Sequence, residues 1–190
     1  ITGVVSSGDI SPGGIFTHTF TTKGTFAYNC AYHPEMQASV KVVDANEVPI
    51  DLGVIAWHDQ LVGAGARIDY HVEYMNIDLS FGTSNATVTV TLPSASNLVA
   101  STRDGNQFPP TVYSGQMLVY NLSAIARYDS GVIDLSVDLP NTLKVNDPVV
   151  LTASIAAVNP DPYPDNNYAE DSETVPGANM VISIRPAYDS

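Results

Sequence analysis

Apolar and polar residues alternate along much of this chain with a period of two. The clearest example is the segment 67–76, RIDYHVEYMN, in which Ile68, Tyr70, Val72 and Tyr74 are separated by polar or charged residues. Successive side chains of a β-strand point to opposite faces of its sheet. The alternation therefore predicts a strand with one buried face and one solvent-facing face.

The same pattern returns several times along the rest of the chain. Further strands are expected in the segments 86–92, 118–122, 133–139, 149–157 and 168–175. Turn-forming residues separate these segments, and none has a convincing helical period. About seven short strands of this kind are typical of an immunoglobulin-like β-sandwich. We therefore expect an all-β chain in which residues 46–175 form such a sandwich.

The N-terminal part also predicts strands, but too few to enclose a core. They are expected at 1–5, 15–21, 25–30 and 38–43, with a turn-rich loop between the first two. Three or four strands cannot form a closed barrel, and an open sheet leaves edges that need covering. Residues 1–45 are therefore predicted to be an incomplete unit.

The segment 26–36, FAYNCAYHPEM, carries a candidate metal site. Cys30, His33 and Met36 offer a thiolate, an imidazole and a thioether, which are the donors that soft transition metals select. A strand ending at Cys30, followed by a turn around Pro34, would bring the three donors toward one ion. The alternative interpretation is that Cys30 is a buried and inert thiol.

Residues 12–43, PGGIFTHTFTTKGTFAYNCAYHPEMQASVKVV, resemble the C-terminal strands and ligand loop of cupredoxins of the plastocyanin, amicyanin and pseudoazurin type. The resemblance implies a partial cupredoxin-like Greek-key sheet and copper coordination by Cys30, His33 and Met36. In the family, a second histidine ligand and about half of the barrel come before this segment. His18 is the nearest candidate here, but relatives carry an aromatic residue at that position. The fourth ligand is thus not identified.

The larger part of the chain resembles a second family. The segments DLGV from Asp51, NATVTVTLP at 85–93 and NPDPYPDNNYAEDSETV at 159–175 are similar to a repeat of bacterial and archaeal surface proteins, domain of unknown function eleven. This resemblance implies an extracellular structural module. It offers no catalytic residues to transfer.

Composition narrows the range of partners. The chain has 20 Asp and Glu against seven Lys and Arg, a formal net charge of −13, so nucleic acid and anionic lipid are not expected partners. A single cysteine excludes an internal disulfide. The chain lacks an initiator Met, a signal peptide and a long apolar run, so we expect a mature or trimmed product without a membrane-spanning segment. No Ser-His-Asp arrangement, Gly-rich phosphate loop or CxxC motif occurs at a useful spacing, and we do not expect an enzyme.

Weaker candidate sites lie in the second part. Asp161, Asp165 and Asn166 place oxygen donors in one proline-rich loop, a calcium site or a turn that uses Pro, Asp and Asn for its backbone geometry. Asn85 and Asn121 begin the sequons NAT and NLS and are candidate glycosylation sites. His58 and His71 are interpreted as surface histidines rather than metal ligands, and either could face a neighbouring subunit.

The C-terminal segment 176–190 predicts one more strand. Met180, Ile182 and Ile184 alternate after the sandwich should be complete. This surplus strand and the incomplete N-terminal sheet suggest head-to-tail β-augmentation between copies, which gives an open filament. The alternative is that the segment begins another domain.

Together these patterns predict an extracellular structural protein of a cell surface or filament. It would form a homopolymer by β-strand complementation and carry a copper-binding loop, with calcium as a second candidate cofactor. The alternative is a type 1 copper electron-transfer protein anchored on a surface β-sandwich.

Overall fold

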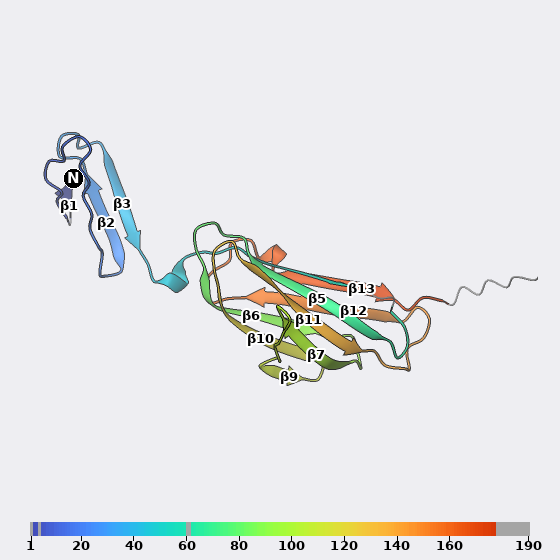
Figure 1. Cartoon of the computed structure of the whole chain (residues 1–190). Helices are drawn as coiled ribbons and strands as arrows, with labels where there is room; N and C mark the ends of the chain where they lie inside the picture. Colours follow the sequence, from blue (N-terminus) through green and yellow to red (C-terminus); the bar gives the residue numbers. More distant parts are fainter. Residues whose placement is uncertain (1, 4, 60–61, 178–190) are drawn as a thin grey trace, which may run out of the picture. The chain divides into compact units, whose positions relative to one another are not determined.

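The computed structural model describes residues 2–3, 5–59 and 62–177. The chain divides into two compact units, Ile1–Pro49 and Ile50–Ser190. Figure 1 shows the strands of both units along the chain. The predicted all-β fold class is confirmed, because strands in antiparallel sheets make up both units.

The N-terminal unit is a sheet of three antiparallel strands in the order β1-β2-β3. The strands are β1 (Thr2–Gly3), β2 (Gly24–Asn29) and β3 (Gln37–Val42), and a 3-10 helix, η1 (Ala45–Glu47), follows them. Phe26 of β2 lies opposite Val40 of β3. Lys23 ties the start of this hairpin to η1 through ion pairs with Asp44 and Glu47.

The strand predicted at 15–21 is wrong, because these residues are assigned to no strand. The strand β2 pairs with β3 along one edge, and β1 takes the Tyr28–Asn29 end of its other edge. The side chains of Phe16, His18 and Phe20 instead line one hollow together with Phe26 and Val40 of the sheet. The alternation in 15–21 therefore indicates correctly that Phe16, His18 and Phe20 lie on one side of the segment, although the segment forms no hydrogen-bonded strand.

The second unit is a β-sandwich of two five-stranded sheets. The first sheet has the order β4-β5-β11-β7-β8, and the second sheet has the order β13-β12-β6-β10-β9. The first consists of β4 (Leu52–His58), β5 (Arg67–Asn76), β11 (Ser130–Asp138), β7 (Asn97–Arg103) and β8 (Asn106–Gln107). The second consists of β13 (Tyr168–Thr174), β12 (Pro148–Ala156), β6 (Thr83–Thr91), β10 (Met117–Ile125) and β9 (Val112–Ser114). A 3-10 helix, η2 (Pro164–Asn166), precedes β13.

The inward positions of these strands form a single apolar core. Alternate residues of β5, β6, β11 and β12 are buried, as the sequence pattern predicted; Ile68, Val88, Leu135 and Leu151 are fully enclosed. Burying each such side chain contributes about 1.5 to 3 kcal/mol to folding. In β11, Gly131 lies opposite Tyr74, and a Cβ atom at Gly131 would overlap the Tyr74 hydroxyl. The second unit therefore has the buried core that a stable domain needs.

No helix within 2–3, 5–59 or 62–177 is long and apolar enough to cross a membrane.

Candidate functional site

The three predicted copper ligands lie on one loop at the end of β2. Backbone hydrogen bonds fix its shape: the Met36 N–H donates to the His33 carbonyl at 2.9 Å, and the Cys30 N–H donates to the Met36 carbonyl at 3.0 Å. The Gln37 side chain also donates to the Pro34 carbonyl at 3.0 Å. The turn predicted around Pro34 therefore forms and returns the chain into β3.

Two of the three donor atoms are close enough to share an ion. The Cys30 Sγ atom lies 3.7 Å from His33 Nδ1. Metal–thiolate and metal–imidazole bonds of about 2.3 Å and about 2.0 Å, meeting at about 120°, would place sulfur and nitrogen about 3.7 Å apart. Cys30 is half-buried, and the Met36 side chain is 61% exposed. The Cys30–His33 pair therefore fits a bound copper ion, whereas the weak axial position would be filled by a largely exposed thioether.

Within the described residues, no fourth ligand joins Cys30, His33 and Met36. In the described part of the chain, no group of three or more His, Cys, Asp or Glu side chains is arranged to hold a metal ion. His18 belongs to the aromatic face of the unit, where its ring meets Phe20 edge-on at 4.8 Å, and Phe20 lies 4.6 Å from Phe26. The ligand set consequently stays at the three donors that the sequence predicted.

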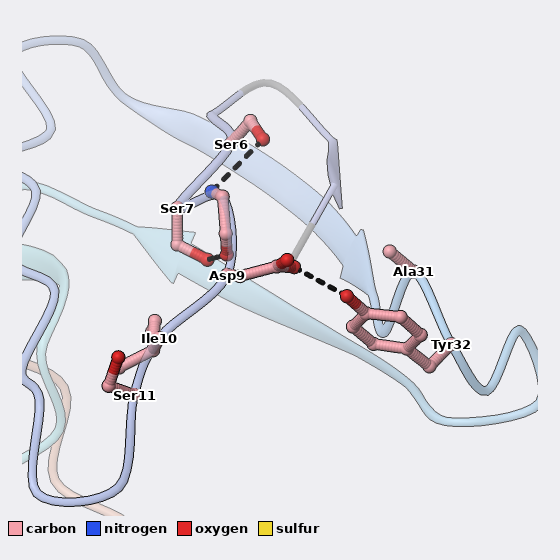
Figure 2. Close-up of a pocket in the computed structure, with 8 residues that line it drawn as sticks. Ser6, Ser7, Asp9, Ile10, Ser11, Ala31 and Tyr32 are labelled. Atoms are coloured by element: carbon pink, nitrogen blue, oxygen red, sulfur yellow. Dashed lines mark hydrogen bonds between the residues drawn. The ribbon is translucent and has the colours of Figure 1, made fainter.

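A second contact positions the ligand loop. The Tyr32 hydroxyl donates to Asp9 Oδ1 at 2.7 Å, and this hydrogen bond raises the pKa of Tyr32. Figure 2 shows the Tyr32 side chain directed at Asp9 beside a hollow that the 6–11 loop also lines. The bond joins the N-terminal loop to Tyr32, the residue directly before His33. It therefore restricts the loop on which the thiolate and imidazole lie.

In the second unit, His58 ties the two sheets together at one edge of the sandwich. It occupies the last inward position of β4, and its Nδ1 and Nε2 atoms lie 2.5 Å from Asp171 Oδ2 and 3.0 Å from Glu173 Oε2 of β13. An ionised carboxylate only accepts hydrogen bonds, so both contacts are hydrogen bonds when the imidazole is protonated and both of its ring nitrogens donate. Partial burial lowers the pKa of His58, but the bonds to Asp171 and Glu173 outweigh it, and the pKa is raised. The cluster is an ion-paired connection between the sheets.

The Tyr70 hydroxyl is buried beside this cluster. Tyr70 lies opposite His58 in the β4–β5 ladder, and its ring is 5.6 Å from the imidazole. Its hydroxyl has no hydrogen-bond partner among the described residues. Burial, with the nearby charges of Asp171 and Glu173, raises the Tyr70 pKa, so the phenol stays protonated.

His71 forms a similar cluster on the outer face of the first sheet. Its Nδ1 lies 2.7 Å from Asp134 Oδ1 of β11, and its Nε2 lies 3.1 Å from Asp59 Oδ2. The imidazole stacks on Trp57 with 5.2 Å between ring centroids. Burial again lowers the pKa of His71, but the bonds to Asp134 and Asp59 raise it by more, so the net shift is upward. Both ring nitrogens face carboxylates, so this histidine is placed for charge pairing.

The sequence pattern predicts surface histidines at His58 and His71, and neither cluster follows from it. The alternation in β4 could have indicated that the His58 side chain points inward, since it follows Leu52, Val54 and Ala56 on the inward face of the strand. The partners Asp171 and Glu173 lie more than a hundred residues away along the chain. The pattern within one strand does not identify the strand across the sandwich.

The proline-rich loop holds the predicted calcium residues in a hydrogen-bonded arrangement. Asp161 accepts bonds from the Leu52 N–H at 2.9 Å, the Tyr163 N–H at 2.8 Å and the Asn167 side chain at 2.9 Å. Asn166 donates to Asp51 at 2.8 Å. These bonds anchor the loop to the start of β4, as the turn interpretation proposes. Calcium binding by Asp161, Asp165 and Asn166 stays a prediction.

The remaining candidates fall at defined positions. Asn85 lies in β6 and Asn121 in β10, and both are exposed. Met180, Ile182 and Ile184 lie outside the described residues.

No protein-family model matches the chain, and no curated protein matches it. Three solved structures similar to it are the CARDB domain of a Pyrococcus furiosus protein, the bacterial hydrophobin BslA and a variant of the major pilin subunit of Bacillus cereus. The first shares 16% identity with a TM-score of 0.44, covering 67% of this chain and 96% of the domain. The second shares 19% with a TM-score of 0.43, covering 70% and 100%. The third shares 12% with a TM-score of 0.42, covering 80% and 47%.

The class of protein is defined by its own architecture: an all-β protein whose larger unit is an immunoglobulin-like β-sandwich. The resemblances to cupredoxins and to the surface-protein repeat stay predictions, because no family model matches.

Proposed function

We propose that this protein is an extracellular structural protein of a cell surface or filament, in which a strand from a neighbouring copy completes the N-terminal unit. One observation carries the proposal: every residue from 5 to 49 is at least partly exposed. The second unit, in contrast, encloses a full core. A sheet that buries none of these residues is not stable alone in water.

One face of the N-terminal sheet, together with the 15–21 segment that contacts it, is apolar and aromatic and stays partly exposed. Phe16, Phe20, Phe26, Tyr28 and Val40 line a hollow of about 230 Å³ on it. Covering such a face releases about 25 cal/mol for each Å² of apolar surface removed from water. This burial would favour an occupant that adds apolar side chains at every second position, as a β-strand does.

The backbone of the same sheet also offers an edge for a further strand. Among residues 2–3, 5–59 and 62–177, β3 pairs with β2 alone and ends the sheet order. An incoming strand would satisfy the N–H and C=O groups along that edge. We assign the donor role to the segment around Met180, Ile182 and Ile184, whose alternation supplies three apolar side chains to one face. Donor and acceptor are then different surfaces, so the contact would propagate.

The proposal is tested with two complementary variants. Phe26→Asp with Val40→Asp disables the acceptor face, and Met180→Asp with Ile182→Asp and Ile184→Asp disables the donor. Each variant alone should remain monomeric by sedimentation velocity, while their mixture should give a discrete dimer, since one intact donor meets one intact acceptor. Val99→Asp, at an exposed position of β7, is the matched control and should still polymerise.

Trp57 is the only tryptophan, so its fluorescence reports whether the second unit remains folded in every variant. Monomeric wild-type protein over a wide concentration range would contradict the proposal. So would a mixture of the two variants that fails to form the dimer. Coverage of the aromatic face by further chain of the same polypeptide is the alternative that those results would favour.

A second candidate function is electron transfer through copper, and the 3.7 Å distance between Cys30 Sγ and His33 Nδ1 favours it. Copper would supply one-electron chemistry when bound. Cys30 would hold it as a thiolate and His33 as a neutral imidazole, so binding would release protons. The Tyr32–Asp9 bond would keep the loop in position.

Copper binding is tested by adding Cu²⁺ to the monomer and to the assembled protein and recording visible absorption. An intense copper–thiolate band that Cys30→Ser abolishes would support a type 1 site. A band only in the assembly would mean that a neighbour supplies the fourth ligand. Absence of the band in both folded forms would leave the structural function alone.

A further inference from the structure

The outward face of the second sheet differs in chemistry from the outward face of the first. Its three central strands, β12, β6 and β10, contain no Asp, Glu, Lys or Arg. Hydroxyl and amide side chains point outward instead, including Thr87, Thr89, Thr91, Asn121, Thr152 and Ser154. In the first sheet, by contrast, the single strand β5 already carries three charged residues, Arg67, Asp69 and Glu73. In a chain with 20 acidic residues, this neutral, hydroxyl-rich face stands out.

Both sequons of the chain lie on that face. Asn85 begins the sequon that ends at Thr87, and Asn121 begins the one that ends at Ser123. The strands β6 and β10 are neighbours, and Asn121 is paired directly with Thr87. Two sequons separated by more than thirty residues in the sequence are therefore side by side on one surface. Both asparagine side chains are exposed.

The second sequon lies at an irregularity in the pairing between β10 and β6. The pairing of β10 with β6 shifts register between Asn121 and Ser123, and Ser123 has a φ of 62°. Asn121 Oδ1 accepts a hydrogen bond from the Ser123 N–H at 2.9 Å, which forms an Asx-turn inside the sequon. This bond uses the amide oxygen, whereas glycan attachment takes place at the amide nitrogen. A bulge of this kind re-aims a side chain at a sheet surface.

We propose that Asn85 and Asn121 carry N-linked oligosaccharides, which cover the neutral face of the second sheet. The inference rests on the proposed extracellular function, because attachment requires export. In the transfer, the asparagine Nδ2 atom forms a bond to the anomeric carbon of a lipid-linked oligosaccharide. The amide loses a proton, and the phosphate-bearing lipid leaves.

Glycans at these positions would orient the subunit in an assembly. On this side of the sheet, Glu170 of the edge strand β13 lies opposite Thr152, but β12, β6 and β10 carry no charges of their own. An uncharged sheet surface of this kind favours stacking on other sheets. Two oligosaccharides would hydrate it and exclude a neighbouring subunit from it. The contacts between copies are then confined to the remaining surfaces, and this face is directed to solvent.

The test is glycopeptide mass spectrometry on protein from its native source and on sequon variants expressed there. The wild type should carry a glycan on both asparagines. Thr87→Val keeps the shape of the side chain and should remove the glycan from Asn85 alone, whereas Thr87→Ser should retain it. Ser123→Ala and Ser123→Thr make the same comparison at Asn121. Unmodified asparagines in wild-type protein would overturn the proposal.

A second measurement tests the direction of the face. Thr89→Arg places a charge at the centre of the neutral face and should leave assembly by sedimentation unchanged, because no neighbour packs there. Loss of assembly in that variant would overturn the solvent-facing assignment and favour stacking of this sheet on another copy. Protein that assembles without glycans refutes this inference alone. Glycosylated protein that stays monomeric refutes the proposed assembly alone.

Discussion

At the scale of single residues, charge pairing in this acidic protein relies heavily on two histidines. His58 and His71 each lie between two carboxylates, and each is expected to be protonated where an isolated histidine would be neutral. The pair occupies adjacent rungs of the β4–β5 ladder, since Trp57 is opposite His71 and His58 is opposite Tyr70. Protonation therefore changes the charge on both faces of one hairpin end.

The His71 charge is directly observable through Trp57. A protonated imidazole stacked on indole quenches its fluorescence, and the upward shift of the His71 pKa extends this quenching above the ordinary value of about 6.5. We expect Trp57 emission to rise with pH, with a midpoint above about 6.5. Asp134→Asn should lower the midpoint, and His71→Gln should abolish the transition. The control His58→Gln should retain it; a wild-type midpoint at or below the ordinary value would contradict the charge assignment.

The His58 pair makes the stability of the second unit pH-dependent. Its folded-state pKa is raised, so the stabilisation is fully present below about pH 6.5 and is lost as the pH rises through the raised value. Replacing His58 by Ala at low pH should cost about 1.5 to 3 kcal/mol, the range for hydrogen bonds to charged groups. Urea unfolding of the wild type, measured from about pH 6.5 to above the raised His58 pKa, should show this loss of stability. His58→Ala should remove this part of the pH dependence; an unchanged pH dependence would show that the cluster does not control stability.

At the scale of elements, alternation predicted the core strands well and the contacts between them poorly. The segment 67–76 has the same bounds in the structure as in the sequence pattern, because its apolar positions need only a local period. The segment 15–21 alternates too, yet it pairs with no strand. Hydrogen-bond partners and cross-sheet contacts, such as His58 with Asp171, depend on which elements meet in space. For the candidate site, the Cys30–His33 pair was predictable because both residues lie on one loop.

One packing detail in the sandwich can be tested directly. Gly131 of β11 lies under the Tyr74 ring, and an added methyl group would overlap that side chain. Gly131→Ala should therefore destabilise the second unit by about 1 to 3 kcal/mol, the usual cost of overpacking. Combining it with Tyr74→Leu, which shortens the facing side chain, should cost less than the sum of the two single variants. Strict additivity in urea unfolding would show that the two positions do not clash.

At the scale of the whole molecule, the two units differ in how they are stabilised. The second unit has its own core, whereas residues 5–49 are all at least partly exposed. The proposed assembly therefore predicts that the two units respond differently to polymer formation. Trp57 and the core of the sandwich should behave alike in monomer and polymer, and the changes should concentrate in the N-terminal sheet.

Amide hydrogen exchange can resolve that difference strand by strand. In the monomer, the amides of β2 and β3 should exchange fast, because a small sheet without a buried core opens locally at little free-energy cost. In the polymer, an added strand and a covered aromatic face should slow exchange in β3 by at least about tenfold, equivalent to about 1.4 kcal/mol of local stability. Amides of β6 and β11 should change little, and they serve as the internal control. Equal protection of β3 in both states would contradict strand complementation; a change spread over both sheets of the sandwich would place the contact on the second unit instead.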